Sequence, residues 1–327
     1  MSRPTWKALG AVTGAAILGA VLWQTGIDPV LTGLRSLDPV TLALGVALGV
    51  PTTVACAWRW HIVSRELGVR VDLGTAVASC YRAQFLNSTL PGGVLGDVHR
   101  GVRHGRDAGD TARGMRAVAW ERLAGQVVQA VVAVLVLLLV PSPVRSTMPA
   151  VLGVLLVATL AAALLIWHVP SPEPPSLAGR MLMAIRDDVW RLVMVRHAWP
   201  GVVLASTVAL GFYFATYLLA AHAVGVTASA FTLLPVVMLV LLAAGLPLNL
   251  AGWGPREGMA AWAFAAAGLG AEQGLATAVA FAAIVLVASL PGAVVLVVAS
   301  ARRRRVRPVP QAPGGPPLPV VQGGTHG

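Results

Sequence analysis

The chain has 327 residues, of which 57% are hydrophobic and only 11% are charged, and its mean hydropathy is +0.76. Soluble globular domains are about 25% charged, so this composition excludes that class and indicates an all-α integral membrane protein. The net charge of +11 would suit nucleic acid, but the placement of the basic residues beside apolar segments favours membrane topology signals and predicts no nucleic-acid partner.

Eight apolar stretches approach or exceed the roughly 20 helical residues that cross a hydrocarbon core. In chain order the predicted spans are Ala8–Thr25, Val40–Val63, Ala117–Val140, Ala150–Val169, Gly201–Val224, Phe231–Leu250, Ala251–Gly270 and Leu275–Ser300. With the N-terminus in the cytosol, only Arg35 and Arg145 among the 24 basic residues fall on outer loops. This bias predicts a multi-pass protein of the cytoplasmic membrane with both termini in the cytosol.

The segment Ala76–Leu90, between the second and third spans, is too short and too polar to cross as an ordinary helix. We predict a re-entrant helix that dips into the membrane. Pro91, Gly92, Gly93 and Gly96 follow it, and these residue types interrupt a helix because proline lacks a donor and glycine adopts conformations that other residues avoid. A broken helix leaves backbone polar groups available to a ligand.

A second break, with Pro247, Gly252 and Gly254, lies far downstream. Both segments read Leu-Pro-x4-Gly-x3-Arg, from Leu90 to Arg100 and from Leu246 to Arg256, at a constant offset of 156 residues. Paired breaks in two halves of a membrane protein indicate an internal repeat and point to a transporter's substrate site. The alternative is coincidence, because membrane proteins use these residue types heavily.

Acid-base pairs accompany both breaks. Asp97 and Arg100 are spaced to share one helix face, and Glu121 and Arg122 stand at the mouth of the third span. Arg256 and Glu257 lie between apolar stretches, where a charge costs several kcal/mol, so they form either a mutual ion pair or a cavity site for a lipid headgroup. Arginine suits phosphate because its planar fork donates two hydrogen bonds.

Signatures of catalysis are missing from the sequence, which has no His-Glu-x-x-His, Gly-x-Ser-x-Gly, Walker-type lysine or Cys-x-x-Cys motif. We therefore expect no enzyme, no cofactor and no catalytic residues. His99 and His104 lack a third ligand at metal spacing, so no metal site is predicted. Cys56 and Cys80 are not expected to form a disulfide.

Three passages together resemble one known family: Phe85-Leu86-Asn87-x-x-Leu90-Pro91-Gly92-x-x-x-Gly96-Asp97-x-x-Arg100, Glu121-Arg122-Leu123, and Gly252-Trp253-Gly254-x-Arg256-Glu257-Gly258. They resemble the flippase-like membrane domain of lysylphosphatidylglycerol synthases over about residues 10–300. In that family the membrane domain is implicated in moving modified phospholipid between leaflets, and a separate cytosolic domain transfers the aminoacyl group. We expect this chain, which stops at Gly327, to lack that activity. Glu121 departs mildly from the aspartate that the family often has.

The resemblance and the charges together give the candidate residues. Those for headgroup binding are Asn87, Asp97, Arg100, Glu121, Arg122, Arg256 and Glu257, and those for helix breaks or hinges are Pro91, Gly92, Gly93, Gly96, Pro247, Gly252 and Gly254. Residues 1–301 are the predicted membrane domain, and residues 302–327 are a predicted disordered tail, basic and then rich in proline and glycine.

The leading hypothesis is translocation of a phospholipid or polyprenyl-type lipid between leaflets, with Asp97 and Glu257 as candidate proton carriers. A second hypothesis is a non-transporting subunit that docks a cytosolic lipid- or glycan-modifying enzyme through the basic loops and tail. A third, a lipid-modifying enzyme with one of those carboxylates as base, predicts product formation by the protein alone.

Overall fold

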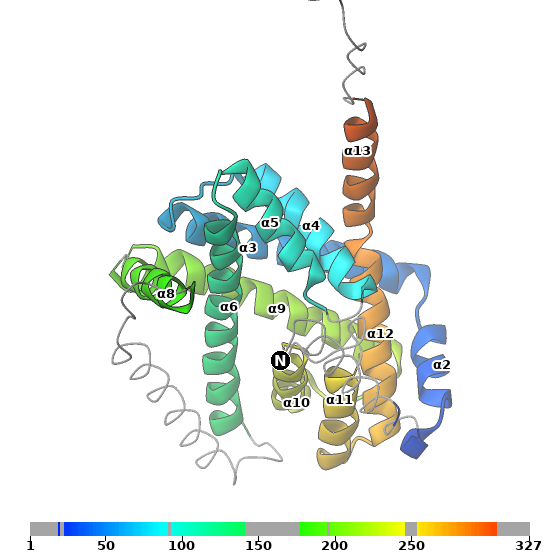
Figure 1. Ribbon diagram of the computed structural model, residues 1–327. Helices are drawn as coiled ribbons and strands as arrows, with labels where there is room; N and C mark the ends of the chain where they lie inside the picture. Colours follow the sequence, from blue (N-terminus) through cyan, green and yellow to red (C-terminus); the bar gives the residue numbers. More distant parts are fainter. Residues whose placement is uncertain are drawn as a thin grey trace, which may run out of the picture.

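The computed structural model describes residues 19, 23–90, 93–140, 177–194, 197–245 and 254–305. Over these residues the chain forms eleven helices and no strand (Figure 1). They are α2 (Asp28–Arg35), α3 (Pro39–Glu66), α4 (Leu73–Thr89), α5 (Leu95–Asp107), α6 (Thr111–Leu139), α8 (Leu177–Met194), α9 (Trp199–Ala223), α10 (Ala230–Ala244), α11 (Pro255–Ala266), α12 (Ala271–Ser289) and α13 (Pro291–Arg305). This architecture confirms the all-α membrane class.

Four helical stretches of the described chain are long and apolar enough to cross a membrane: Pro39–Glu66, Thr111–Leu139, Trp199–Ala223 and Ala271–Ala299. They correspond to the second, third, fifth and eighth predicted spans. Side-chain caps fix where two of them begin. Asp38 accepts a hydrogen bond from the backbone N–H of Thr41 at 2.6 Å before α3, and Asp110 accepts one from Arg113 at 2.9 Å before α6.

Several predicted features lie outside the described residues. These are the span Ala150–Val169, most of the span Ala8–Thr25, the helix-break residues Pro91, Gly92, Pro247 and Gly252, and residues 306–327 of the predicted tail. The break residues Gly93, Gly96 and Gly254 are described.

The sixth and seventh predicted spans correspond to helices shorter than predicted. Helix α10 has 15 residues and α11 has 12, so at 1.5 Å per residue they extend about 22 and 18 Å, less than the roughly 30 Å of a hydrocarbon core. Hydropathy predicts too long a helix at α11, because it does not detect that this helix begins only at Pro255. The residue before it, Gly254, has a φ of +127°. The two helices pack side by side between α6 and α12 (Figure 1).

The segment predicted to dip into the membrane is α4, which has 17 residues. Helix α5 follows the break and packs closely against α4. Gly96 makes this approach possible, since a Cβ there would lie 2.1 Å from the carbonyl oxygen of Ala83. The described chain thus contains two pairs of short helices, α4 with α5 and α10 with α11, each pair flanking a predicted break. That α4 enters the membrane stays a prediction.

The C-terminal helix α13 ends at Arg305, so Arg302–Arg305, the first residues of the predicted tail, are helical. That the tail after them is disordered stays a prediction. Arginine is a good helix former, and the first proline after these residues is Pro308. In Figure 1 α13 continues the direction of α12 and extends beyond the other helices.

The largest buried apolar cluster joins α6, α9, α10, α11 and α12. Tyr217, Val237, Phe264 and Phe281 are buried at its centre. Helix α9 also packs along α3 (Figure 1). It therefore connects this apolar cluster with the polar site formed by α3, α4, α5 and α6.

Candidate lipid-headgroup site

Glu121 of α6 is the centre of a buried ion-pair cluster. Its side chain is 1% exposed, and a carboxylate is almost never buried so fully unless it is paired. Arg59 of α3 donates from Nε to Oε1 at 2.8 Å, and Arg100 of α5 donates from Nη2 to Oε2 at 2.6 Å. Guanidinium groups from two other helices thus bind both carboxylate oxygens, which ties α3, α5 and α6 together.

Asp97, in the first turn of α5, is the second carboxylate of the cluster. Its Oδ1 lies 3.0 Å from Nη2 of Arg100 and accepts from Nη2 of Arg122 at 2.9 Å. Asn87 of α4 donates from Nδ2 to Oδ2 of Asp97 at 2.9 Å and accepts from the backbone N–H of Gly96 at 2.8 Å. Asn87 therefore joins the two sides of the first break.

The charge of Asp97 is fixed by its neighbours. Burial raises the pKa of Asp97, but the charges of Arg122 and Arg100 and the hydrogen bonds from Arg122 and Asn87 outweigh it and lower the pKa to about 2. Asp97 is therefore ionised at neutral pH. This argues against the hypothesis that Asp97 carries a proton.

Arg100 is 2% exposed and has further partners besides the carboxylates. Its Nη1 donates to Sγ of Cys80 at 3.3 Å, and its guanidinium lies 4.6 Å from the ring centroid of Trp60. Burial lowers the pKa of Arg100, but Glu121, Cys80 and Asp97 raise it above its ordinary value. Burial raises the pKa of Cys80 to about 12, so its thiol stays neutral and is not a nucleophile.

Among the described residues, Arg59, Arg100 and Arg122 pair with two carboxylates, Asp97 and Glu121, so the cluster carries one surplus positive charge. The three arginines differ in access. The side chains of Arg59 and Arg100 are 8% and 2% exposed, whereas that of Arg122 is 49% exposed. The surplus charge is therefore accessible at Arg122.

A cavity of about 380 Å³ adjoins Arg122, and both broken segments contribute to its walls. Gly93 and Val94 follow the first break, and Ala244 and Gly245 end α10 just before the second. The remaining lining residues come from α5 and α6, and they are Asp97, Val98, Met115, Val118, Ala119, Arg122 and Gln126. The residues just after the first break and those just before the second thus meet at one cavity.

Two smaller cavities lie beside this one, of about 80 and 30 Å³. Arg122, Arg59, Cys56 and Tyr213 line both of them. Because Arg122 lines all three cavities, it stands between the large cavity and the buried ion pairs.

The charged residues of the second segment form their own pair, as one of the two sequence interpretations predicted. Arg256 donates from Nε to Oε1 of Glu257 at 2.9 Å, and the backbone N–H of Gly254 donates to Oε2 at 2.7 Å. Glu257 therefore binds an N–H at the start of its own helix, where a negative charge is favourable. The guanidinium of Arg256 lies 5.5 Å from the ring centroid of Phe281.

Comparison with protein families identifies the chain's relatives. Residues 7–292 match the family described as lysylphosphatidylglycerol synthase TM region. The chain belongs to the lysylphosphatidylglycerol synthase TM region family. No curated protein matches it. The family resemblance predicted from the sequence motifs is confirmed.

The predicted headgroup residues of this family member separate into two groups. Five of them, Asn87, Asp97, Arg100, Glu121 and Arg122, form the buried cluster beside the cavity. Arg256 and Glu257 form the separate pair on α11. Of the described break residues, Gly93 lines the cavity, Gly96 is the second residue of α5 and Gly254 precedes α11.

Sequence reasoning missed Arg59, Gln126 and Tyr213. Arg59 had a signal, because it lies inside the predicted span Val40–Val63, where a charge needs a partner. Gln126 lies inside the third predicted span and donates from Nε2 to the carbonyl oxygen of Gly245 at 3.2 Å. Nothing in the sequence singled out Tyr213.

Proposed function

We propose that this chain is a lipid translocation protein, not an enzyme, and that Arg122 binds the phosphate of the lipid headgroup in the cavity between the two broken segments. The observation that carries the proposal is the position of Arg122. It is the most exposed of the three arginines in a cluster with one surplus positive charge, and it lines a cavity whose walls include residues just after the first break and just before the second.

The chemistry of the cavity suits a lipid phosphate. Arg122 contributes donors to an anion, and Gln126 offers an amide beside it. The apolar remainder of the wall, with Val94, Val98 and Met115, suits the uncharged parts of a lipid. The ligand class is a membrane phospholipid or a polyprenyl-type lipid phosphate.

The fixed ion pairs supply a frame against which the break segments can rearrange. Arg59, Arg100 and Glu121 hold α3, α5 and α6 together, while α4 and α10 end at the breaks and α11 begins after the second. Discontinuous helices of this kind form substrate sites in transporters. We place the protein in the cytoplasmic membrane, with the basic ends of its helices in the cytosol.

The test is leaflet exchange in proteoliposomes with fluorescent phosphatidylglycerol, aminoacylated phosphatidylglycerol and a polyprenyl phosphate. We expect the wild type to accelerate exchange of at least one of them. Arg122→Gln should slow that exchange about tenfold or more, because a hydrogen bond to a charged group contributes about 1.5–3 kcal/mol.

The matched control is Arg65→Gln. The side chain of Arg65 is 46% exposed, close to the value for Arg122, but it pairs with the adjacent Glu66 away from the cavity. Exchange should be unchanged in this variant. If the folded wild type exchanges none of the three lipids above protein-free vesicles, translocation is refuted, and docking of a cytosolic enzyme becomes the better hypothesis.

A further inference from the structure

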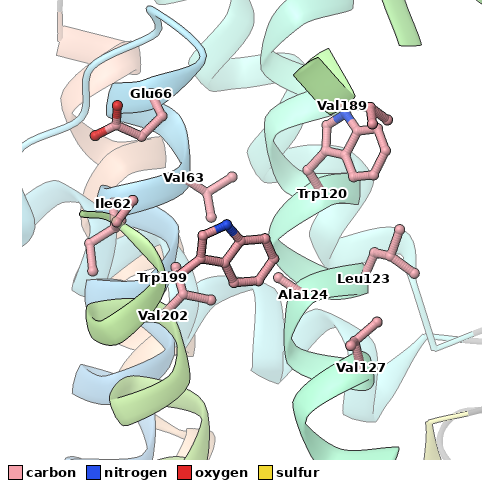
Figure 2. A pocket seen from close by; sticks show the side chains of 11 residues that line it. Ile62, Val63, Glu66, Trp120, Leu123, Ala124, Val127, Val189, Trp199 and Val202 are labelled. Atoms are coloured by element: carbon pink, nitrogen blue, oxygen red, sulfur yellow. The ribbon is translucent and has the colours of Figure 1, made fainter. Parts of the chain in front are cut away.

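An apolar groove lies between α3, α6 and the start of α9, on a different face of α6 from the cavity (Figure 2). Its volume is about 220 Å³. Figure 2 shows Ile62, Val63 and Val202 on one side and Leu123, Ala124 and Val127 on the other, with the ring of Trp199 between them. These walls offer no polar partner, so the groove suits a hydrocarbon chain.

The groove continues into an exposed apolar stripe along α6. Leu123 and Val127 line the groove, and Val131, Leu135 and Leu139 follow at intervals of four residues. Their exposed fractions run from 50% to 77%. Because α6 is one of the candidate membrane spans, this stripe is a surface for lipid chains.

Polar groups gather at one end of the groove. Asp188 of α8 accepts a hydrogen bond from Nε of Arg116 at 2.7 Å and another from Nε1 of Trp120 at 3.1 Å. Glu66, at the end of α3, lies 3.7 Å from Nε2 of His197. Trp120 turns its apolar ring to the groove and its N–H to Asp188, as tryptophan does at a membrane interface.

The groove is therefore polar at one end and apolar along its length, which is the pattern of a lipid. Packing by another helix fits less well, because helix interfaces in membranes favour small residues, and the exposed stripe consists of Leu and Val. Val189 of α8 lines the polar end, so an occupant would also contact α8.

We propose that this groove binds one acyl chain of a membrane phospholipid, with the headgroup at the end where Arg116 and His197 face Asp188 and Glu66, and with the chain directed along α6. The site is separate from the cavity at Arg122 and does not depend on translocation. A lipid held there joins α8 to α3 and α9.

The test counts phospholipid retained by the purified full chain after detergent exchange, by native mass spectrometry with added phosphatidylglycerol as the probe. We expect one retained lipid per chain in Arg122→Gln, which lacks the separate cavity site. In that background Ala124→Phe fills the groove and should reduce retention about tenfold or more, because the added ring takes the space of the chain. Val294→Phe, in the same background, adds the same ring at an exposed position of α13, which lines neither site, and should leave retention unchanged.

A second pair of variants covers the case in which Ala124→Phe does not fold. Leu123→Asn in the groove should lower retention, and Leu44→Asn, at a position of α3 outside the groove with an equal exposed fraction (50%), should not. Circular dichroism and gel filtration check folding for all four variants.

Photolabelling separates the possible occupants. Phosphatidylglycerol with a diazirine in its acyl chain should label α3, α6 and α9 at the groove, and Ala124→Phe should abolish that label. The proposal is overturned if a folded groove variant retains lipid like the wild type. It is also overturned if a Cys at position 124 crosslinks to residues 150–169 or to a second copy while the groove takes no lipid label.

Discussion

The two broken segments carry the same motif but hold their charges in different ways. In the first, Asp97 and Arg100 bind side chains from other helices, including Glu121 and Arg122 of α6. In the second, Glu257 binds Arg256 beside it and the N–H of its own helix start. The first segment is therefore joined to the protein frame, while the charges of the second are satisfied locally.

The starts of the helices explain the difference. Helix α5 begins at Leu95 and α11 at Pro255, 160 residues later, whereas the motifs are 156 residues apart. The matched arginines therefore sit one helical turn apart relative to their helix starts. Arg100 reaches Glu121 from the second turn, and Arg256, in the first turn, pairs with its neighbour.

The largest expected effect is loss of Glu121, the acid of α6 to which the first segment binds. Glu121→Gln leaves Arg59 buried without a countercharge and Arg100 with Asp97 alone, and removing one partner of a buried pair costs about 3–5 kcal/mol. Unfolding in detergent, followed by tryptophan fluorescence, would measure the loss. A loss below about 1 kcal/mol would contradict a structural role for the cluster.

A pH titration should also single out the first segment. The pKa of Asp97 is lowered to about 2 from its ordinary 3.8, so its ion pairs stabilise the fold above about pH 4, and this contribution, about 2 kcal/mol, is lost as the pH falls toward 2. The difference in unfolding free energy between wild type and Asp97→Asn should stay constant from pH 7 to about pH 4 and then shrink. A difference that changes between pH 7 and 5 would contradict this assignment.

The smallest of these effects is expected in the second segment. Glu257→Gln removes a charge, but the amide can still accept the N–H of Gly254, and one guanidinium loses its partner where Glu121 has two. The expected cost is about 1 kcal/mol, comparable to loss of a helix cap. If Glu257→Gln destabilises as much as Glu121→Gln in the same unfolding assay, the contrast between the segments is refuted.

The sequence was sufficient to predict the all-α membrane class and five residues that meet in the ion-pair cluster. The spans that begin near Val40, Ala117 and Gly201 match helices because each is a long apolar run. The lengths of α10 and α11 could not be predicted, since hydropathy averages do not register where a helix starts again after Gly254.

The pairing within the site depends on tertiary packing. Five of the predicted headgroup residues meet, but that Asp97 binds Arg122 and that Glu121 binds Arg59, 62 residues away, follows from how α3, α5 and α6 cross. Gln126 and Gly245 are likewise brought together only by the contact between α6 and α10. The spacing of residues along one sequence does not show which side chains of different helices meet.

The most direct test of the Arg122 cavity is binding of a soluble short-chain phosphatidylglycerol, measured as the rise in Tm of the detergent-solubilised protein with ligand concentration. The wild type and Arg256→Gln should show the same concentration-dependent rise, and Arg122→Gln should show a smaller one, from the separate groove alone. A full rise in Arg122→Gln, or its loss in Arg256→Gln alone, would contradict the account and move the headgroup site to the second segment.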